Sequence, residues 1–152
     1  MPQMKKIEFC PPNGAWTETP VTDQRSASAI RFRHEGDKDR PQMFEVKFGP
    51  NEIVGAHAHY VDEVIYVLEG SILFGQRVLG PGASVSVPAN VLYSFKIGPH
   101  GAHYLNFRGT RDLTNFNREQ LAELLKLEGA AQHEYVRAHT ESQMGQYRGP
   151  VE

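Results

Sequence analysis

The stretch that decides the fold is Gly55-Ala56-His57-Ala58-His59-Tyr60-Val61-Asp62-Glu63. On a β-strand, residues two apart point to the same face, so His57 and His59 project together. Glu63 has the same parity and follows a short bend. Two neutral imidazoles and one carboxylate can bind a divalent metal ion and leave positions open for water or substrate, as in non-haem iron(II) oxygenases. A His-x-His pair alone is also common as surface polarity, so the flanking sequence matters.

Short apolar runs and turn residues alternate on both sides of this stretch. Phe44, Val46 and Phe48 alternate with more polar neighbours, which is the period of a half-buried strand. By the same reasoning we expect strands at 43–48, 64–68, 72–74, 77–79, 83–87, 92–97 and 103–107. Many short strands at this spacing predict a sandwich or barrel rather than alternating strands and helices.

The segment from 51 to 97 resembles the two sequence motifs of the cupin superfamily. The first motif, G-x5-H-x-H-x3-4-E-x6-G, is matched at His57, His59, Glu63 and Gly70. The second, G-x5-P-x-G-x2-H-x3-N, is matched at Gly82 and Pro88. Asn51 and Asn90 stand where these motifs have glycine, and asparagine also tolerates positive φ.

This resemblance implies an all-β fold, the double-stranded β-helix of the cupin jelly-roll barrel, with one C-terminal helix. We expect a single cupin domain over residues 1–152. Its core barrel would span about 43–108, with N-terminal strands and an arm at 1–42, and the helix and a tail at 114–152.

The resemblance also implies one divalent metal ion per chain, bound by His57, His59 and Glu63. Iron(II) is the first choice, with manganese, nickel and zinc as alternatives. Cupins commonly use three histidines and one glutamate, but Tyr93 stands at the position of the third histidine. Three alternatives follow: the three remaining ligands suffice, Tyr93 binds as a phenolate, or the site is empty.

Tyr93 and His103 are the candidate catalytic residues. Tyr93 shares a strand face with Phe95 and Ile97, so we expect its hydroxyl inside the barrel near the metal; the alternative is a core tyrosine bonded to a backbone carbonyl. His103 could replace the missing ligand or act as an acid or base. The alternative is a histidine at a strand end near the mouth, because the loop at 98–101 leaves its register open.

The same alternation predicts a mostly apolar cavity around this polar cluster, as is usual for small-molecule sites. Its expected lining is Phe44, Val46, Phe48, Ile65, Val67, Phe95, Leu105 and Phe107. The alternative for most of these residues is a filled barrel core.

One amphipathic helix is expected near the end of the chain. Asn117 can cap it, with Gln120 completing a capping box. Leu121, Leu124 and Leu125 recur at helical spacing, and Gly129 is expected to end the helix. The polar residues 131–152 are interpreted as a tail.

The composition excludes several classes of protein. At 152 residues with a formal net charge of −2, the chain suits one domain and has no basic stripe for nucleic acid. The longest strongly apolar run, residues 64–68, is too short to span a bilayer. Cys10 is the only cysteine, so no intramolecular disulfide can form and a cytoplasmic location is expected.

These observations lead to two hypotheses on function. The first is a metal-dependent enzyme that acts on a small organic molecule, with a non-haem dioxygenase preferred and an isomerase, lyase or decarboxylase as alternatives. The second is a non-catalytic cupin that binds a small molecule. The resemblance implies a homodimer, with the N-terminal strands, Tyr66 and Leu68 as candidate contacts.

Overall fold

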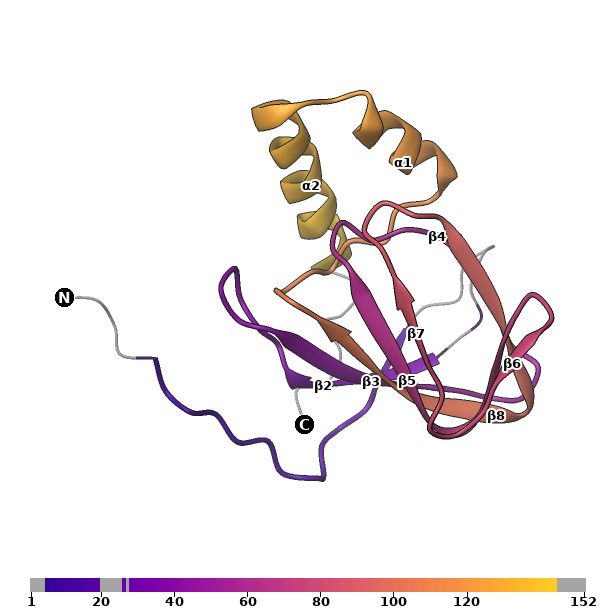
Figure 1. Cartoon of the computed structure of the whole chain (residues 1–152). Coiled ribbons are helices and arrows are strands. Elements are labelled where there is room, and N and C mark those ends of the chain that lie inside the picture. Colours follow the sequence, from indigo (N-terminus) through magenta and orange to yellow (C-terminus); the bar gives the residue numbers. More distant parts are fainter. Residues whose placement is uncertain (1–4, 20–25, 27, 145–152) are drawn as a thin grey trace.

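The structure is a computed structural model that describes residues 5–19, 26 and 28–144. In this part of the chain, strands form most of the fold and two helices follow them (Figure 1). The strands are β1 (Thr17–Thr19), β2 (Ser28–His34), β3 (Gln42–Phe48), β4 (Ile53–His57), β5 (Glu63–Phe74), β6 (Arg77–Leu79), β7 (Ser84–Val87) and β8 (Tyr93–Arg108). The helices are α1 (Arg118–Leu125) and α2 (Gly129–Met144).

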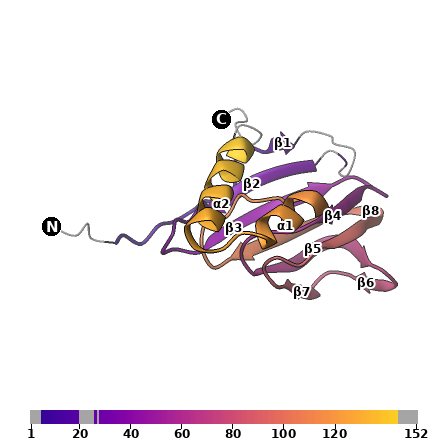
Figure 2. The same cartoon turned by 90° about the horizontal axis from the view of Figure 1, so that it is seen from above.

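All strand pairs are antiparallel, and β8 lies at the centre of the sheet. The main order is β1-β2-β3-β8-β5-β6, while β4 also pairs with β8 and β7 with β5. The strands curve around a common interior, and the two helices lie together over one side of them (Figure 2). The predicted all-β barrel is therefore confirmed in its main features.

Two predicted strand breaks are wrong, because β5 and β8 each continue where we expected a turn or loop. β5 runs through Gly70, with register shifts on both sides of it, and β8 runs through Gly101. Both glycines have positive φ, 70° and 80° respectively. They also approach each other closely, since a Cβ on Gly70 would lie 2.0 Å from the Gly101 carbonyl oxygen. The chain thus bends inside the ladder.

The inward face of the strands forms the main core. Phe44, Val46 and Phe48 are buried, as their alternation predicts. Ile65 and Val67 from β5 join them, so these two predicted cavity residues pack in the filled part of the barrel.

The C-terminal region holds two helices where one was expected. Asn117 caps α1, and the reciprocal capping box with Gln120 is present as predicted. Gly129, with φ of 55°, begins α2 instead of ending α1, so most of the expected tail is helical. Residues 145–152 of that tail lie outside the described residues.

A second, smaller core joins the helices to the barrel. It contains Ala58, Phe116, Leu121 and Leu124, and side chains from α2 pack against it. Phe116 also forms a backbone bridge with Ala58, directly beside His59. The helices therefore hold the segment after β8 against the histidine stretch. In the described part of the chain, no helix is long and apolar enough to cross a membrane.

Candidate functional site

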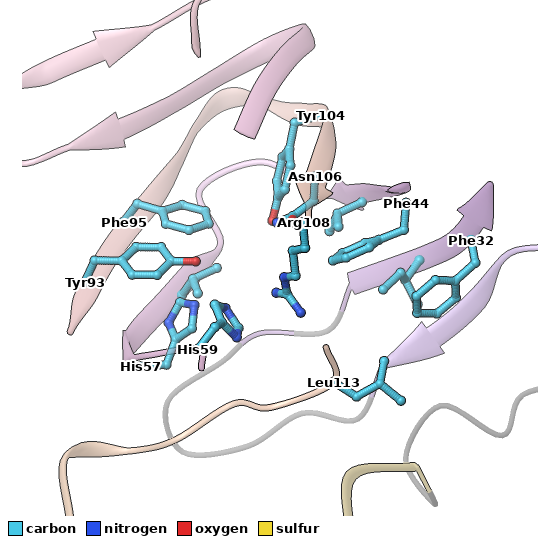
Figure 3. Close-up of a pocket in the computed structure, with 13 residues that line it drawn as sticks. Phe32, Phe44, His57, His59, Tyr93, Phe95, Tyr104, Asn106, Arg108 and Leu113 are labelled. Carbon is cyan, nitrogen blue, oxygen red and sulfur yellow. The ribbon is translucent and has the colours of Figure 1, made fainter. Parts of the chain in front are cut away.

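A pocket opens between β2, β3, β4, β8 and the segment that follows β8 (Figure 3). Aromatic and aliphatic side chains line most of it, and its polar lining consists of His57, His59, Tyr93, Asn106 and Arg108, with the Tyr104 hydroxyl. The cavity measures about 40 Å³, which is room for a few water molecules. Only a small ligand, or part of a larger one, fits without movement of the side chains.

The two histidines lie next to each other at one side of the pocket. His57 ends β4 opposite Tyr93, and His59 follows two residues later. Their ring centroids are 5.0 Å apart. The Nδ1 of His57 bonds the Gly55 carbonyl at 2.8 Å, and the Nδ1 of His59 bonds the Thr114 carbonyl. A carbonyl oxygen only accepts, so each Nδ1 carries a proton, and in the neutral form of either ring the lone pair is on Nε2.

Glu63, the first residue of β5, is 1% exposed, and both of its carboxylate oxygens accept hydrogen bonds from neighbouring side chains. The Tyr93 hydroxyl donates to its Oε1, while Nε and Nη2 of Arg108 donate to its Oε2 at 3.2 and 3.1 Å. Burial acts to raise the pKa of Glu63, but the His59 imidazole, the Arg108 guanidinium and the Tyr93 hydroxyl lower it to about 2. The carboxylate is therefore ionised at neutral pH.

Arg108, the last residue of β8, is also buried and connects Glu63 to the segment after the strand. Its Nη1 donates to the Asp112 carbonyl oxygen at 2.6 Å and lies 3.5 Å from the Asp112 carboxylate. The Thr114 hydroxyl donates to that carboxylate at 2.9 Å. Because the Thr114 carbonyl accepts from His59, one buried network orients both Arg108 and His59.

The protonation states of His59 and Tyr93 follow from their burial and neighbours. Burial, and then the charge of Arg108, lowers the pKa of His59 well below its usual range. Burial, and then the charge of Glu63, raises the pKa of Tyr93 well above its usual range. At neutral pH His59 is therefore a neutral base and Tyr93 a hydroxyl donor. These neighbours disfavour the phenolate form of Tyr93, which was one of the three alternatives for the site.

The predicted metal ligands come together only in part. The two imidazoles suit a metal, because backbone carbonyls orient metal-binding histidines in the same way. The oxygens of the third group, Glu63, already accept hydrogen bonds from Tyr93 and Arg108, and His59 Nε2 lies 3.7 Å from Glu63 Oε1. Within residues 5–19, 26 and 28–144, no three His, Cys, Asp or Glu side chains are grouped so that they could hold a metal ion. The metal thus stays a prediction.

His103 lies on the outer side of β8, away from the pocket. Its Nε2 is 2.8 Å from Glu45 Oε1, and its ring meets Trp16 edge-on. Tyr104, Asn106 and Arg108 are the residues of this half of β8 that line the pocket. Leu105 and Phe107, which we expected in the cavity, alternate with these and face outward. Phe107 is 38% exposed.

Sequence reasoning missed Asn106, Arg108, Asp112 and Thr114. A signal existed, because the polar side chains of Asn106 and Arg108 recur two residues apart in a strand that ends near the predicted site. Leu105 and Phe107 masked it, since apolar residues normally mark the inner face. Asp112 and Thr114 lie in an irregular segment, where periodicity carries no information.

Comparisons with known proteins agree with this architecture. No family model matches the sequence, and no curated protein does. Among solved structures, the polyketide cyclase RemF from Streptomyces resistomycificus is 20% identical with a TM-score of 0.54, over 88% of this chain and 99% of that one. A cupin-2 domain protein from Rhodospirillum rubrum is 12% identical with a TM-score of 0.57, over 97% and 98%.

A provisional acetylacetone dioxygenase from Methylibium petroleiphilum is 11% identical with a TM-score of 0.58, over 72% of this chain and 81% of that one. At such identities the likeness shows the fold alone, and function has to be argued from the site. The strand order, the two histidines inside the barrel and these three likenesses together show that the chain has the fold of a small cupin domain.

Proposed function

We propose that the chain is a cupin enzyme that moves a proton next to a carbonyl group of a small organic molecule. The observation that carries this proposal is the set of groups at the polar end of the pocket. A neutral imidazole, a protonated tyrosine and a buried guanidinium all line one small cavity. These are the groups that proton abstraction requires: a base, a hydrogen-bond donor and a cation.

His59 is the proposed base. Its Nδ1–H bond to the Thr114 carbonyl leaves the Nε2 lone pair to accept a proton from a substrate carbon. Glu63 Oε1 lies 3.7 Å from Nε2, so its negative charge would stabilise the imidazolium that forms. His57 has the same tautomer and is the second candidate for this role.

Arg108 is the proposed electrophilic group. Loss of a proton beside a carbonyl puts negative charge on the carbonyl oxygen, and a cation fixed in a buried site stabilises this charge more than water does. Hydrogen bonds to Glu63 and Asp112 hold the guanidinium in place. The Tyr93 hydroxyl could donate to the same oxygen if it leaves Glu63.

The metal-dependent dioxygenase expected from the sequence is the second candidate. The orientation of both imidazoles by backbone carbonyls favours it. Bound iron(II) would supply dioxygen activation there. The ion pair of Glu63 with Arg108 favours the first candidate, because Arg108 already neutralises the carboxylate charge that a metal ion would use.

Deuterium exchange tests the proposal without knowledge of the natural substrate. Acetone, pyruvate and dihydroxyacetone are small enough to probe the cavity, and loss of their carbon-bound protons in D2O is followed by ¹H NMR. We expect exchange faster than in buffer for at least one probe, unchanged after treatment with EDTA. His59→Gln should reduce it by about 100-fold.

His103→Gln is the matched control, since it changes a histidine on the outer face of the same barrel. Its exchange rate should equal that of the wild type. Two results would contradict the proposal. One is the absence of exchange for all three probes, and the other is exchange that EDTA abolishes and iron(II) restores.

A further inference from the structure

His139 in α2 is a buried histidine that does not line the inner pocket. The residue is 8% exposed, and its ring packs on Phe116 with the ring centroids 4.4 Å apart. Nε2 of His139 accepts a hydrogen bond from the Asn115 backbone N–H at 3.0 Å. Because a backbone N–H only donates, Nε2 carries no proton in this bond, and the imidazole is neutral.

The Asn115 N–H belongs to the same peptide group as the Thr114 carbonyl, which accepts the Nδ1–H of His59. This peptide is trans, so its C=O and N–H point in opposite directions, and the group is planar and rigid. His59 and His139 thus bind the two ends of one rigid unit. A hydrogen bond at one end also polarises the other. His139 therefore helps to fix the group that orients His59, and makes its carbonyl a better acceptor.

The residues on both sides of this peptide connect it to the barrel. The Thr114 hydroxyl donates to the Asp112 carboxylate at 2.9 Å. Phe116 and Ala58 exchange two backbone hydrogen bonds, at 2.8 and 2.9 Å, and Ala58 directly precedes His59. A peptide that is no longer held by α2 should therefore loosen its neighbours in the histidine stretch as well.

A proton on Nε2 of His139 would remove this hold. Two N–H groups would then face each other, and the Asn115 N–H would lose its acceptor. Burial lowers the pKa of His139 below its usual value of 6.5, so the unfolded chain takes up this proton more readily than the folded protein. The bond and its contribution to stability are therefore present above about pH 6.5 and are lost as the pH falls through the folded pKa.

Charged neighbours do not compete with this effect, since burial is the cause of the shift among the described residues. In the segment beside His139, the Asp112 carboxylate is held by Arg108 and Thr114. The other titratable groups of the small core are Tyr60 and Tyr135. The charged side chains of the two helices are exposed, namely Arg118, Glu119, Glu123, Glu134, Arg137 and Glu141.

We propose that His139 is a positioning residue for the inner pocket, which acts on His59 through the Thr114–Asn115 peptide and releases that peptide when Nε2 takes up a proton. Helix α2 thereby makes the order of the site depend on pH, so the site is held in neutral solution and loosened in mild acid. Only the effect on catalysis rests on the proposed function, since the hold on the peptide can be measured without a substrate.

Backbone amide hydrogen exchange, followed by NMR between about pH 7.5 and 5, tests the hold on the peptide. Protection factors are compared, because they correct for the intrinsic pH dependence of exchange. In the wild type the protection of Asn115 should fall about tenfold over this range, the factor that corresponds to one net hydrogen bond. His139→Gln keeps an acceptor that cannot be protonated, so its protection should stay at the neutral value. His139→Leu removes the acceptor and should be about tenfold less protected at every pH.

Two further measurements test whether the effect reaches the site. The Phe116 and Ala58 amides should lose protection together with Asn115. The deuterium exchange rate of the three carbonyl probes at about pH 7.5 should fall several-fold in His139→Leu and be restored in His139→Gln. If no probe exchanges in the wild type, the proposed function fails, and the amide measurements still decide the role of His139.

His133→Gln is the matched control, because His133 is an exposed histidine on the same helix. It should behave as the wild type in each measurement. The proposal is overturned if the protection of Asn115 in the wild type does not depend on pH, or if His139→Gln and His139→Leu behave alike. It is also overturned if Asn115 alone responds while Phe116 and Ala58 do not, since His139 would then hold only its own bond.

Discussion

Glu63 and Arg108 lie directly opposite each other in the β5–β8 ladder and form a buried ion pair, in which Nε and Nη2 of Arg108 both donate to Oε2 of Glu63. They stand at the first position of β5 and the last of β8, so the pair joins the ends of these two strands. Removing one member of such a pair leaves a buried charge without compensation. The pair therefore links the stability of the barrel to the geometry of the site.

Arg108→Met should lower the free energy of unfolding by about 3 to 5 kcal/mol, because it leaves the Glu63 carboxylate buried and unpaired. The double variant Glu63→Leu/Arg108→Met should recover part of this loss, since no charge remains inside. Urea unfolding followed by circular dichroism measures both. Arg137→Met, which breaks exposed pairs with Glu134 and Glu141, should change little. An Arg108→Met protein of wild-type stability would refute the buried pair.

Acid should destabilise the protein between about pH 5 and pH 2 through Glu63. The pKa of Glu63 is lowered from 4.5 to about 2 on folding, so its contribution is present above the unfolded value and disappears as the folded value is approached. Glu45, on the outer face, has a pKa of about 2 as well. The contributions of Glu63 and Glu45 are separated by measuring the free energy of unfolding of Glu63→Gln and of Glu45→Gln across this pH range. Each variant should show a shallower slope than the wild type.

Protonation of His59 should destabilise the protein at a higher pH than protonation of either carboxylate does. Its folded pKa lies well below 6.5, so the unfolded chain takes up a proton first. Stability should therefore decrease as the pH falls below about 6.5. His59→Gln, which cannot be protonated, should remove this part of the slope between pH 7 and 5. An unchanged slope in that interval would mean that His59 is already charged in the folded protein.

Tyr93→Phe should keep the fold but weaken both stability and activity. It deletes the hydroxyl that donates to the ionised Glu63 carboxylate, a loss of about 1 to 3 kcal/mol. The deuterium exchange rate should also fall, since the variant lacks the hydroxyl that we propose can turn from Glu63 to the carbonyl oxygen. Tyr66→Phe, at an exposed tyrosine on β5, is the control and should change neither. Full exchange activity in Tyr93→Phe would exclude the hydroxyl from the reaction.

Elemental analysis separates the two candidate functions. Protein purified without a tag or chelator should contain far less than one equivalent of iron, manganese, nickel or zinc, because Arg108 and Tyr93 bind Glu63. His57→Ala/His59→Ala should then leave the metal content unchanged. Stoichiometric metal that is lost in this double variant would instead support the metal-dependent enzyme.

Local sequence signals predicted the features that depend on local geometry. Asn51 and Asn90, which replace motif glycines, both have φ of 60°, as their tolerance of the left-handed region predicted. The capping box at Asn117 was predicted because both of its partners lie within one turn. The inward parity of Tyr93 was predicted from Phe95 and Ile97, which are both buried in the core.

The features that sequence missed depend on contacts between distant segments. Both faces of the second half of β8 carry large side chains, so its parity could not be assigned from the sequence. Trp16, far away in the chain, packs against His103 on the outer face. Arg108 is buried where Glu63 and Asp112 compensate its charge. No local pattern encodes these pairings.

The central position of β8 also determines when the barrel can form. This strand pairs with β3, β4 and β5, so none of these three has its main partner until residues 93–108 exist. During synthesis, the first two thirds of the chain would therefore remain without a closed sheet. Because the pairing with β8 joins segments that are distant in sequence, folding should be slow. Once formed, the middle of β8 cannot open without breaking several ladders at once. Its amide protons should then be among the last to exchange with solvent, on the timescale of global unfolding.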